Sequence, residues 1–222
     1  MYQGSEEMLF DRVHVGELAC LTVRPTACRL AVVCAMLFAV LLPVAAQGAD
    51  LEAGRRKAEA CVACHGRNGN STIPARPSLA GQPPLYTFLQ LIQFREKRRT
   101  DPEMSPMTAG LSETDMQDLA AYFAVQTPVS ASEGTDPDKA GAGQRVAEAH
   151  HCASCHGPGL LGQKHIPRLA GLHYEYLLKQ LRGFKAQTRA DVDGSMTTAA
   201  QPLSDTDIDN LAHYMARLSV AR

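Results

Sequence analysis

The sequence has no tryptophan, and its 222 residues include only 6 tyrosines and 6 phenylalanines. It also has no excess of either charge. Of 22 basic and 23 acidic side chains, three and four lie in the first 49 residues, so residues 50–222 are balanced. A nucleic-acid-binding surface needs a clustered basic excess, and the sequence therefore excludes this class of partner. With so few large aromatic side chains, a small domain in this chain needs a further source of stability.

Sustained alternation of apolar and polar residues is also missing, which argues against β-strands. Helical signals are present instead. Ser112 followed by Asp115, and Ser204 followed by Asp207, predict two capping boxes at helix starts. The sequence therefore predicts an all-α fold.

Residues 1–49 differ from the rest of the chain. After Arg24 and Arg29 comes an apolar run from Leu30 to Ala46, and no charged residue follows until Asp50. A basic flank, an apolar run and small residues at its end are typical of a secretory signal peptide. The alternative is an uncleaved membrane anchor, because the uncharged stretch is nearly long enough to span a bilayer. Either interpretation predicts export to the periplasm.

From residue 50 the sequence repeats itself, with four similar blocks in the same order. The paired blocks are CVACHG and CASCHG, PSLAG and PRLAG, YTFLQLIQF and YLLKQLRGF, and LSETDMQDLAAY and LSDTDIDNLAHY. The segment 127–139 between the copies is rich in Pro, Ser, Gly and Asp, which is typical of a linker. We therefore predict a leader at 1–49, a first domain at 50–126, a linker at 127–139 and a second domain at 140–222.

Four cysteines of the repeated region form two pairs, and each pair is followed at once by a histidine. The motifs are Cys61, Cys64 and His65, then Cys152, Cys155 and His156. C-x-x-C-H is the attachment motif of c-type haem. On one helical turn the two thiols reach the two vinyl groups of haem, and the imidazole of the adjacent histidine reaches the iron. The sequence predicts two covalently bound haem c groups.

Other uses of C-x-x-C fit less well. A thioredoxin-like motif lies in a βαβ unit, for which the sequence gives no sign. A shared zinc site is possible in principle, but it does not explain a histidine after each pair. A local disulfide suits an exported protein, but it closes a small strained ring and needs no histidine. A haem would also supply the missing core, and Tyr86 and Phe94 pack either on the ring or in an ordinary core.

The repeat also selects a candidate for the second axial ligand. Met104 precedes Leu111 by seven residues, and Met196 precedes Leu203 by seven. Met107 corresponds to Ala199, so only one methionine position is common to both copies. We predict that Met104 and Met196 are axial ligands, carried on rigid loops, and that Met107 serves packing or fills the loop. Five histidines have no partner in the first copy and are expected at the surface or beside a haem; they are His150, His151, His165, His173 and His213.

Pro77 and Pro167 recur before the L-A-G blocks. A carbonyl group at this position could accept the Nδ1 proton of the haem histidine, because such ligands are usually oriented by a second hydrogen bond.

Iron with histidine and methionine on its two faces has no open position for a substrate, and this ligand pair raises the reduction potential. The chemistry favours one-electron transfer between proteins over catalysis.

Residues 50–222 resemble a two-haem class I cytochrome c of the cytochrome c4 type. The resemblance is carried by the C-x-x-C-H-G, P-x-L-A-G and L-A-x-Y blocks and by the methionine register. It implies two class I cytochrome domains related by a pseudo-twofold axis, with haem edges near their interface. It also implies a periplasmic carrier, often membrane-associated, that takes electrons from a donor such as a quinol-oxidising complex and passes them towards a terminal oxidase. The rival classes are a dihaem oxidoreductase of the peroxidase or thiosulfate dehydrogenase type and a cytochrome subunit of a larger complex.

Overall fold

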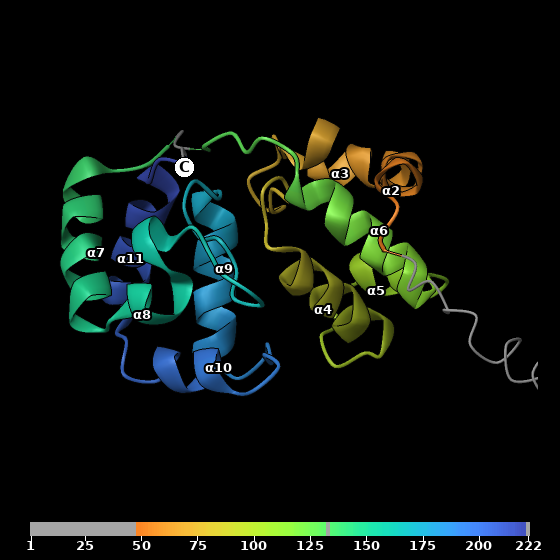
Figure 1. Cartoon of the computed structure of the whole chain (residues 1–222). Helices are drawn as coiled ribbons and strands as arrows, with labels where there is room; N and C mark the ends of the chain where they lie inside the picture. The colour runs from red at the N-terminus through yellow and green to blue at the C-terminus, as the bar shows by residue number, and fades with distance from the viewer. Residues whose placement is uncertain (1–47, 132–133, 221–222) are drawn as a thin grey trace, which may run out of the picture. The chain divides into compact units, whose positions relative to one another are not determined.

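The computed structural model describes residues 48–131 and 134–220 (Figure 1). The predicted leader at 1–49 therefore lies almost wholly outside the described residues. Residues 48–222 cluster as one compact unit. Within the described residues the secondary structure is helical, apart from one isolated bridge between Gln163 and Ile166, so the predicted all-α fold is confirmed. No helix in this described part is long and apolar enough to cross a membrane.

The two repeats contain matching helices in the same order (Figure 1). Those of the first repeat are α2 (Leu51–Ala58), η1 (Glu59–Cys61), α3 (Val62–His65), η2 (Arg67–Gly69), α4 (Pro84–Arg95), α5 (Met104–Thr108) and α6 (Glu113–Ala124). Those of the second are α7 (Pro137–Ala149), α8 (Cys152–His156), η3 (Pro158–Leu160), α9 (Tyr174–Lys185), α10 (Ser195–Ala200) and α11 (Asp205–Arg217). Helix α7 begins with Asp136 as its N-cap, so the last three residues of the predicted linker are helical. The composition of residues 137–139 favours a loop, but proline is favourable at the first position of a helix.

Each repeat is built around its last helix. Helix α6 packs against α2 and α4, and α11 packs against α7 and α9. Both last helices begin with the predicted capping box, formed by Ser112 with Asp115 and by Ser204 with Asp207. Their buried faces carry apolar side chains at helical spacing, such as Leu119 in the first repeat.

The first and last helices of each repeat cross at a glycine. A Cβ atom on Gly54 would lie 2.2 Å from the carbonyl oxygen of Asp118, and one on Gly143 would lie 2.0 Å from that of Asn210. Real Cβ atoms do not approach so closely, and the obstacle is backbone rather than a movable side chain. The glycines therefore allow the first and last helices of each repeat to cross closely.

This contact gives a prediction with a matched control in the same helix. Gly143→Ala should lower the free energy of unfolding by about 3 kcal/mol, because the two helices must separate. A Cβ atom on Gly141 would instead point into open space, with no neighbouring group within 4 Å. Gly141→Ala should raise the stability by about 0.5–1 kcal/mol, because alanine favours a helix more than glycine does. Denaturant unfolding of the haem-loaded protein measures both, and equal effects of the two substitutions would contradict the assigned crossing.

The two repeats contact each other through a buried arginine. The side chain of Gln82 donates to the Arg168 carbonyl group and accepts from the Arg168 N–H group, both at 3.0 Å. The guanidinium group of Arg168 donates to the Ala80 carbonyl group at 2.9 Å. Arg168 is only 1% exposed, so a charged side chain at the contact is held by backbone oxygens. Arg168 stands where the first repeat has Ser78, Gln82 directly follows the PSLAG block, and neither was predicted to join the repeats.

His213 is buried, so a surface position is wrong for this histidine. Its Nδ1 atom accepts the N–H group of Asp136 at 3.1 Å, and its ring stacks on Tyr174 with the centroids 4.2 Å apart. Tyr174 and His213 lie on different helices, so the sequence around His213 gave no sign of this ring pair. Burial lowers the pKa of His213, although the Asp209 carboxylate 3.9 Å away opposes this.

The neutral ring of His213 predicts a loss of stability in acid. The unfolded chain binds a proton at the ordinary histidine pKa, and the folded chain resists binding it, so stability should fall as the pH drops below about 6.5. His213→Gln should flatten this part of the stability profile measured by denaturant unfolding between pH 7 and pH 5. The same slope in wild type and His213→Gln would contradict the prediction.

Candidate haem sites

The two C-x-x-C-H motifs lie on single helical turns. Cys61 is the residue before α3 and Cys64 lies within it, while α8 contains both Cys152 and Cys155. None of these four cysteines is in a disulfide, and in each pair the first is half-buried and the second exposed. Burial raises the pKa of the Cys61 and Cys152 thiols. A thioredoxin-like motif lies in a βαβ unit, whereas the described residues form helices and one isolated bridge, so these pairs do not fit the thioredoxin alternative.

The histidine of each motif is fixed by a backbone carbonyl group. Nδ1 of His65 lies 2.9 Å from the carbonyl oxygen of Pro77, and Nδ1 of His156 lies 2.9 Å from that of Pro167. Both rings are buried, and burial lowers their pKa. A neutral ring that donates from Nδ1 presents Nε2 with its lone pair, which is the form that binds a metal. The predicted hydrogen bonds to Pro77 and Pro167 are present.

The methionines of the common register lie at the starts of short helices, not on loops as predicted. Met104 is the first residue of α5, and Met196 is the second residue of α10. Pro106 suggested a loop, but it stands in the first turn of α5, where a missing N–H group costs nothing. Met104 and Met196 are half-buried, whereas Met107 is 51% exposed. Exposure of Met107 agrees with its exclusion as a ligand, although it also shows that Met107 does not fill a core.

Two aspartates hold these methionine helices, and sequence reasoning missed both. The carboxylate of Asp101 accepts the N–H group of Met104 at 3.1 Å. The carboxylate of Asp191 accepts the N–H group of Met196 at 2.6 Å and the hydroxyl group of Thr197 at 2.9 Å. The aspartates stand three and five residues before their methionines, so the repeat alignment does not pair them.

A pair of arginines was also missed, although the repeat gives a signal for it. Arg99 and Arg189 each follow a phenylalanine of the repeat by five residues. Their guanidinium groups lie over the rings of Phe94 and Phe184, at 4.6 and 4.3 Å from the ring centroids. The matching contacts show that the two sites share their surrounding structure as well as their ligands.

The residues present fit covalent haem better than a bare metal ion. In the described part of the chain, no three His, Cys, Asp or Glu side chains gather as a metal site would require. The two cysteine pairs therefore do not form the shared zinc site that the sequence left open. Each repeat instead offers two free thiols on one turn and a buried histidine oriented through Nδ1. This donor set suits a porphyrin that is held covalently and ligated by imidazole.

The sites and the fold define a class of protein that comparison with known proteins bears out. The family model described as Cytochrome c matches residues 51–125 and 140–219, so the chain belongs to the cytochrome c family. It is a two-domain protein of the cytochrome c4 type, with two covalently bound haem c groups.

Individual relatives support the c4 type over most of the chain. The chain is 40% identical over 189 residues to cytochrome c4 of Thiocapsa roseopersicina, which covers 79% of this chain and 96% of that one. The structure of reduced recombinant cytochrome c4 from Pseudomonas stutzeri superposes with a TM-score of 0.72 at 34% identity, covering 78% of this chain and all of that one. A thiosulfate dehydrogenase electron acceptor of Stutzerimonas stutzeri is 34% identical over 197 residues, covering 81% of this chain and 91% of that one.

Proposed function

We propose that this dihaem electron-transfer protein is a periplasmic one-electron carrier whose two haems both have histidine and methionine as axial ligands. The ligands are His65 and Met104 in the first domain, and His156 and Met196 in the second. The observation that carries this proposal is the equivalence of the two sites. Each has a buried histidine bonded to a proline carbonyl group and a half-buried methionine at a helix start held by an aspartate.

When bound, haem would supply reversible one-electron chemistry at its iron. The surrounding residues of the chain determine whether a small molecule can reach that iron. The Pro77 and Pro167 carbonyl groups orient the imidazoles and increase their basicity, which favours a tight iron bond. The short helices α5 and α10 fix the positions of the thioethers, so little rearrangement accompanies a change of charge. With both axial positions supplied by the chain, neither haem has room for peroxide or another small substrate.

In the cell, we propose that the protein takes electrons from a donor complex and passes them to a terminal oxidase, in the manner implied by its resemblance to cytochrome c4. The leader at 1–49 supports export to the periplasm, with either cleavage or retention as a membrane anchor. A second candidate donor is a thiosulfate-oxidising dehydrogenase, because one relative is named as the electron acceptor of such an enzyme. Both candidates leave this chain in the role of carrier.

Carbon monoxide binding separates a carrier from a dihaem oxidoreductase. The reduced wild-type protein at neutral pH should bind little carbon monoxide, because each iron has two ligands from the chain. The visible spectrum before and after addition of the gas gives the fraction bound. Rapid binding by one of the two haems would indicate an open site and would contradict the carrier proposal.

A further inference from the structure

Asp101 organises the segment that leads into Met104. One oxygen of its carboxylate accepts the N–H groups of both Glu103 and Met104 at 3.1 Å, and its own N–H group donates to the Ser105 hydroxyl at 3.1 Å. A carboxylate oxygen binds N–H groups more strongly than a neutral acceptor does, so Asp101 is well suited to hold the start of this segment.

Helix α9 of the second domain reaches the same segment with two consecutive residues. The Lys179 ammonium group lies 3.8 Å from the second oxygen of Asp101. Gln180 accepts a hydrogen bond from Arg99 at 3.0 Å, and Arg99 also donates to Gln90 of its own domain at 2.5 Å. Arg99 thus bridges the two glutamines that correspond in the repeat, while Lys179 pairs with the aspartate two residues further on.

Among the described residues, the ion pair between Lys179 of the second domain and Asp101 of the first has no counterpart in which the first domain contacts Asp191 of the second. The repeat alignment places Leu89 at the position of Lys179, and leucine cannot pair with a carboxylate. The hydrogen bonds from Met196 and Thr197 to Asp191 both come from its own domain. The two methionine helices are therefore held by similar aspartates, but a lysine of the opposite domain supports only that of the first domain.

We propose that Asp101 is a positioning residue for Met104, and that Lys179 of the second domain holds Asp101 in place. The inference rests on the proposed ligation by Met104. It means that the methionine–iron bond of the first haem depends on contact between the domains, whereas that of the second haem does not use such a lysine. Lys179 is 61% exposed, so its contribution is modest and depends on salt.

The proposal can be tested in the full haem-loaded protein with imidazole, which displaces methionine from ferric haem. The kinetic phases belonging to the two haems are assigned with Met104→Ala and Met196→Ala, each of which abolishes one displacement phase. Lys179→Ala should accelerate displacement at the first haem by about two- to fivefold, the range expected for an exposed ion pair. The second haem should be unaffected, and the difference from wild type should vanish at high salt.

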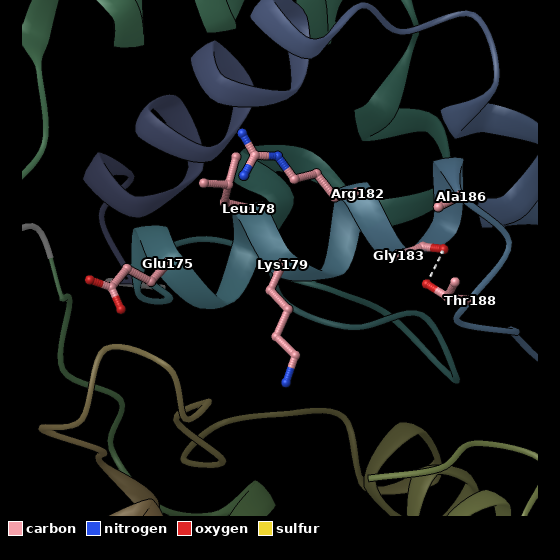
Figure 2. A pocket seen from close by; sticks show the side chains of 7 residues that line it. All are labelled: Glu175, Leu178, Lys179, Arg182, Gly183, Ala186 and Thr188. Carbon is pink, nitrogen blue, oxygen red and sulfur yellow. Dashed lines mark hydrogen bonds between the residues drawn. The ribbon is translucent and has the colours of Figure 1, made fainter.

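Asp101→Asn keeps an oxygen that can accept the Met104 N–H group but removes the charge. It should therefore accelerate displacement at least as much as Lys179→Ala, and the double variant should be no faster than Asp101→Asn alone. Asp101→Ala loses the N–H acceptor as well, and it should accelerate displacement by about tenfold. Arg182 lies one turn from Lys179 on the same helix, and its side chain extends away from that of Lys179 (Figure 2). Both line a cavity of about 460 Å³ beside α9, so Arg182→Ala is a matched control for charge and location and should change neither phase.

Unchanged rates in Lys179→Ala, equal acceleration at both haems, or additive effects in the double variant would each overturn the proposal. Failure of the underlying ligation would look different. In that case wild type itself would show no methionine displacement phase at the first haem.

Discussion

Replacing Met104 with alanine should convert one haem from a closed to an open site, whereas replacing Met107 should leave both haems closed. We expect Met104→Ala to lose about half of the weak red-edge absorption band that marks methionine bound to ferric haem. The reduced variant should then bind about one carbon monoxide per chain, because iron is left with histidine as its only ligand from the chain.

Met107→Ala is the matched control, since the two methionines are three residues apart in the same helix. Met107 is 51% exposed and has no methionine at its position in the second repeat. Its replacement should preserve the red-edge band and the resistance to carbon monoxide. Loss of the band in Met107→Ala would show that the register argument had selected the wrong thioether.

The second large effect concerns haem attachment. Cys152→Ala combined with Cys155→Ala should lower the covalently bound haem from two groups to one per chain, as measured by a pyridine haemochrome spectrum. The second domain should also lose much of its helical circular-dichroism signal, because a small domain without its apolar cofactor has too little core.

The equivalent change in the first domain, Cys61→Ala with Cys64→Ala, tests whether the two sites are independent. It too should leave one haem, now in the second domain, since each domain carries its own thiols and histidine. Retention of two covalent haems in either double variant would contradict the assignment of the attachment residues.

The sequence predicted those parts of the sites that depend on short fixed spacing. The C-x-x-C-H turns and the capping boxes are local patterns, and the structure contains each of them twice. Ligation of iron by the methionines of the common register stays a prediction. The hydrogen bonds to Pro77 and Pro167 could also be predicted, because a histidine that binds a metal generally needs a second hydrogen-bond partner to orient its ring.

The parts that the sequence did not predict depend on contacts between distant segments. Asp101 and Asp191 stand at different distances from their methionines, so no alignment pairs them, and only the folded backbone shows that they have the same role. The short helices α5 and α10 were predicted as loops because proline and small polar residues usually break helices. Arg168, buried between the repeats, could not be recognised because its guanidinium group donates to the backbone oxygen of Ala80, which no sequence pattern marks.

The central claim is that two haems, both ligated by histidine and methionine, make this chain a carrier of single electrons. An anaerobic redox titration followed by visible spectra, including the red-edge band, tests it most directly. We expect two one-electron steps per chain, at the positive potentials that this ligand pair favours, with a ferric band of the strength of two methionine-bound haems. A single step of one electron, or a band of half this strength together with a haem at much lower potential, would contradict the account.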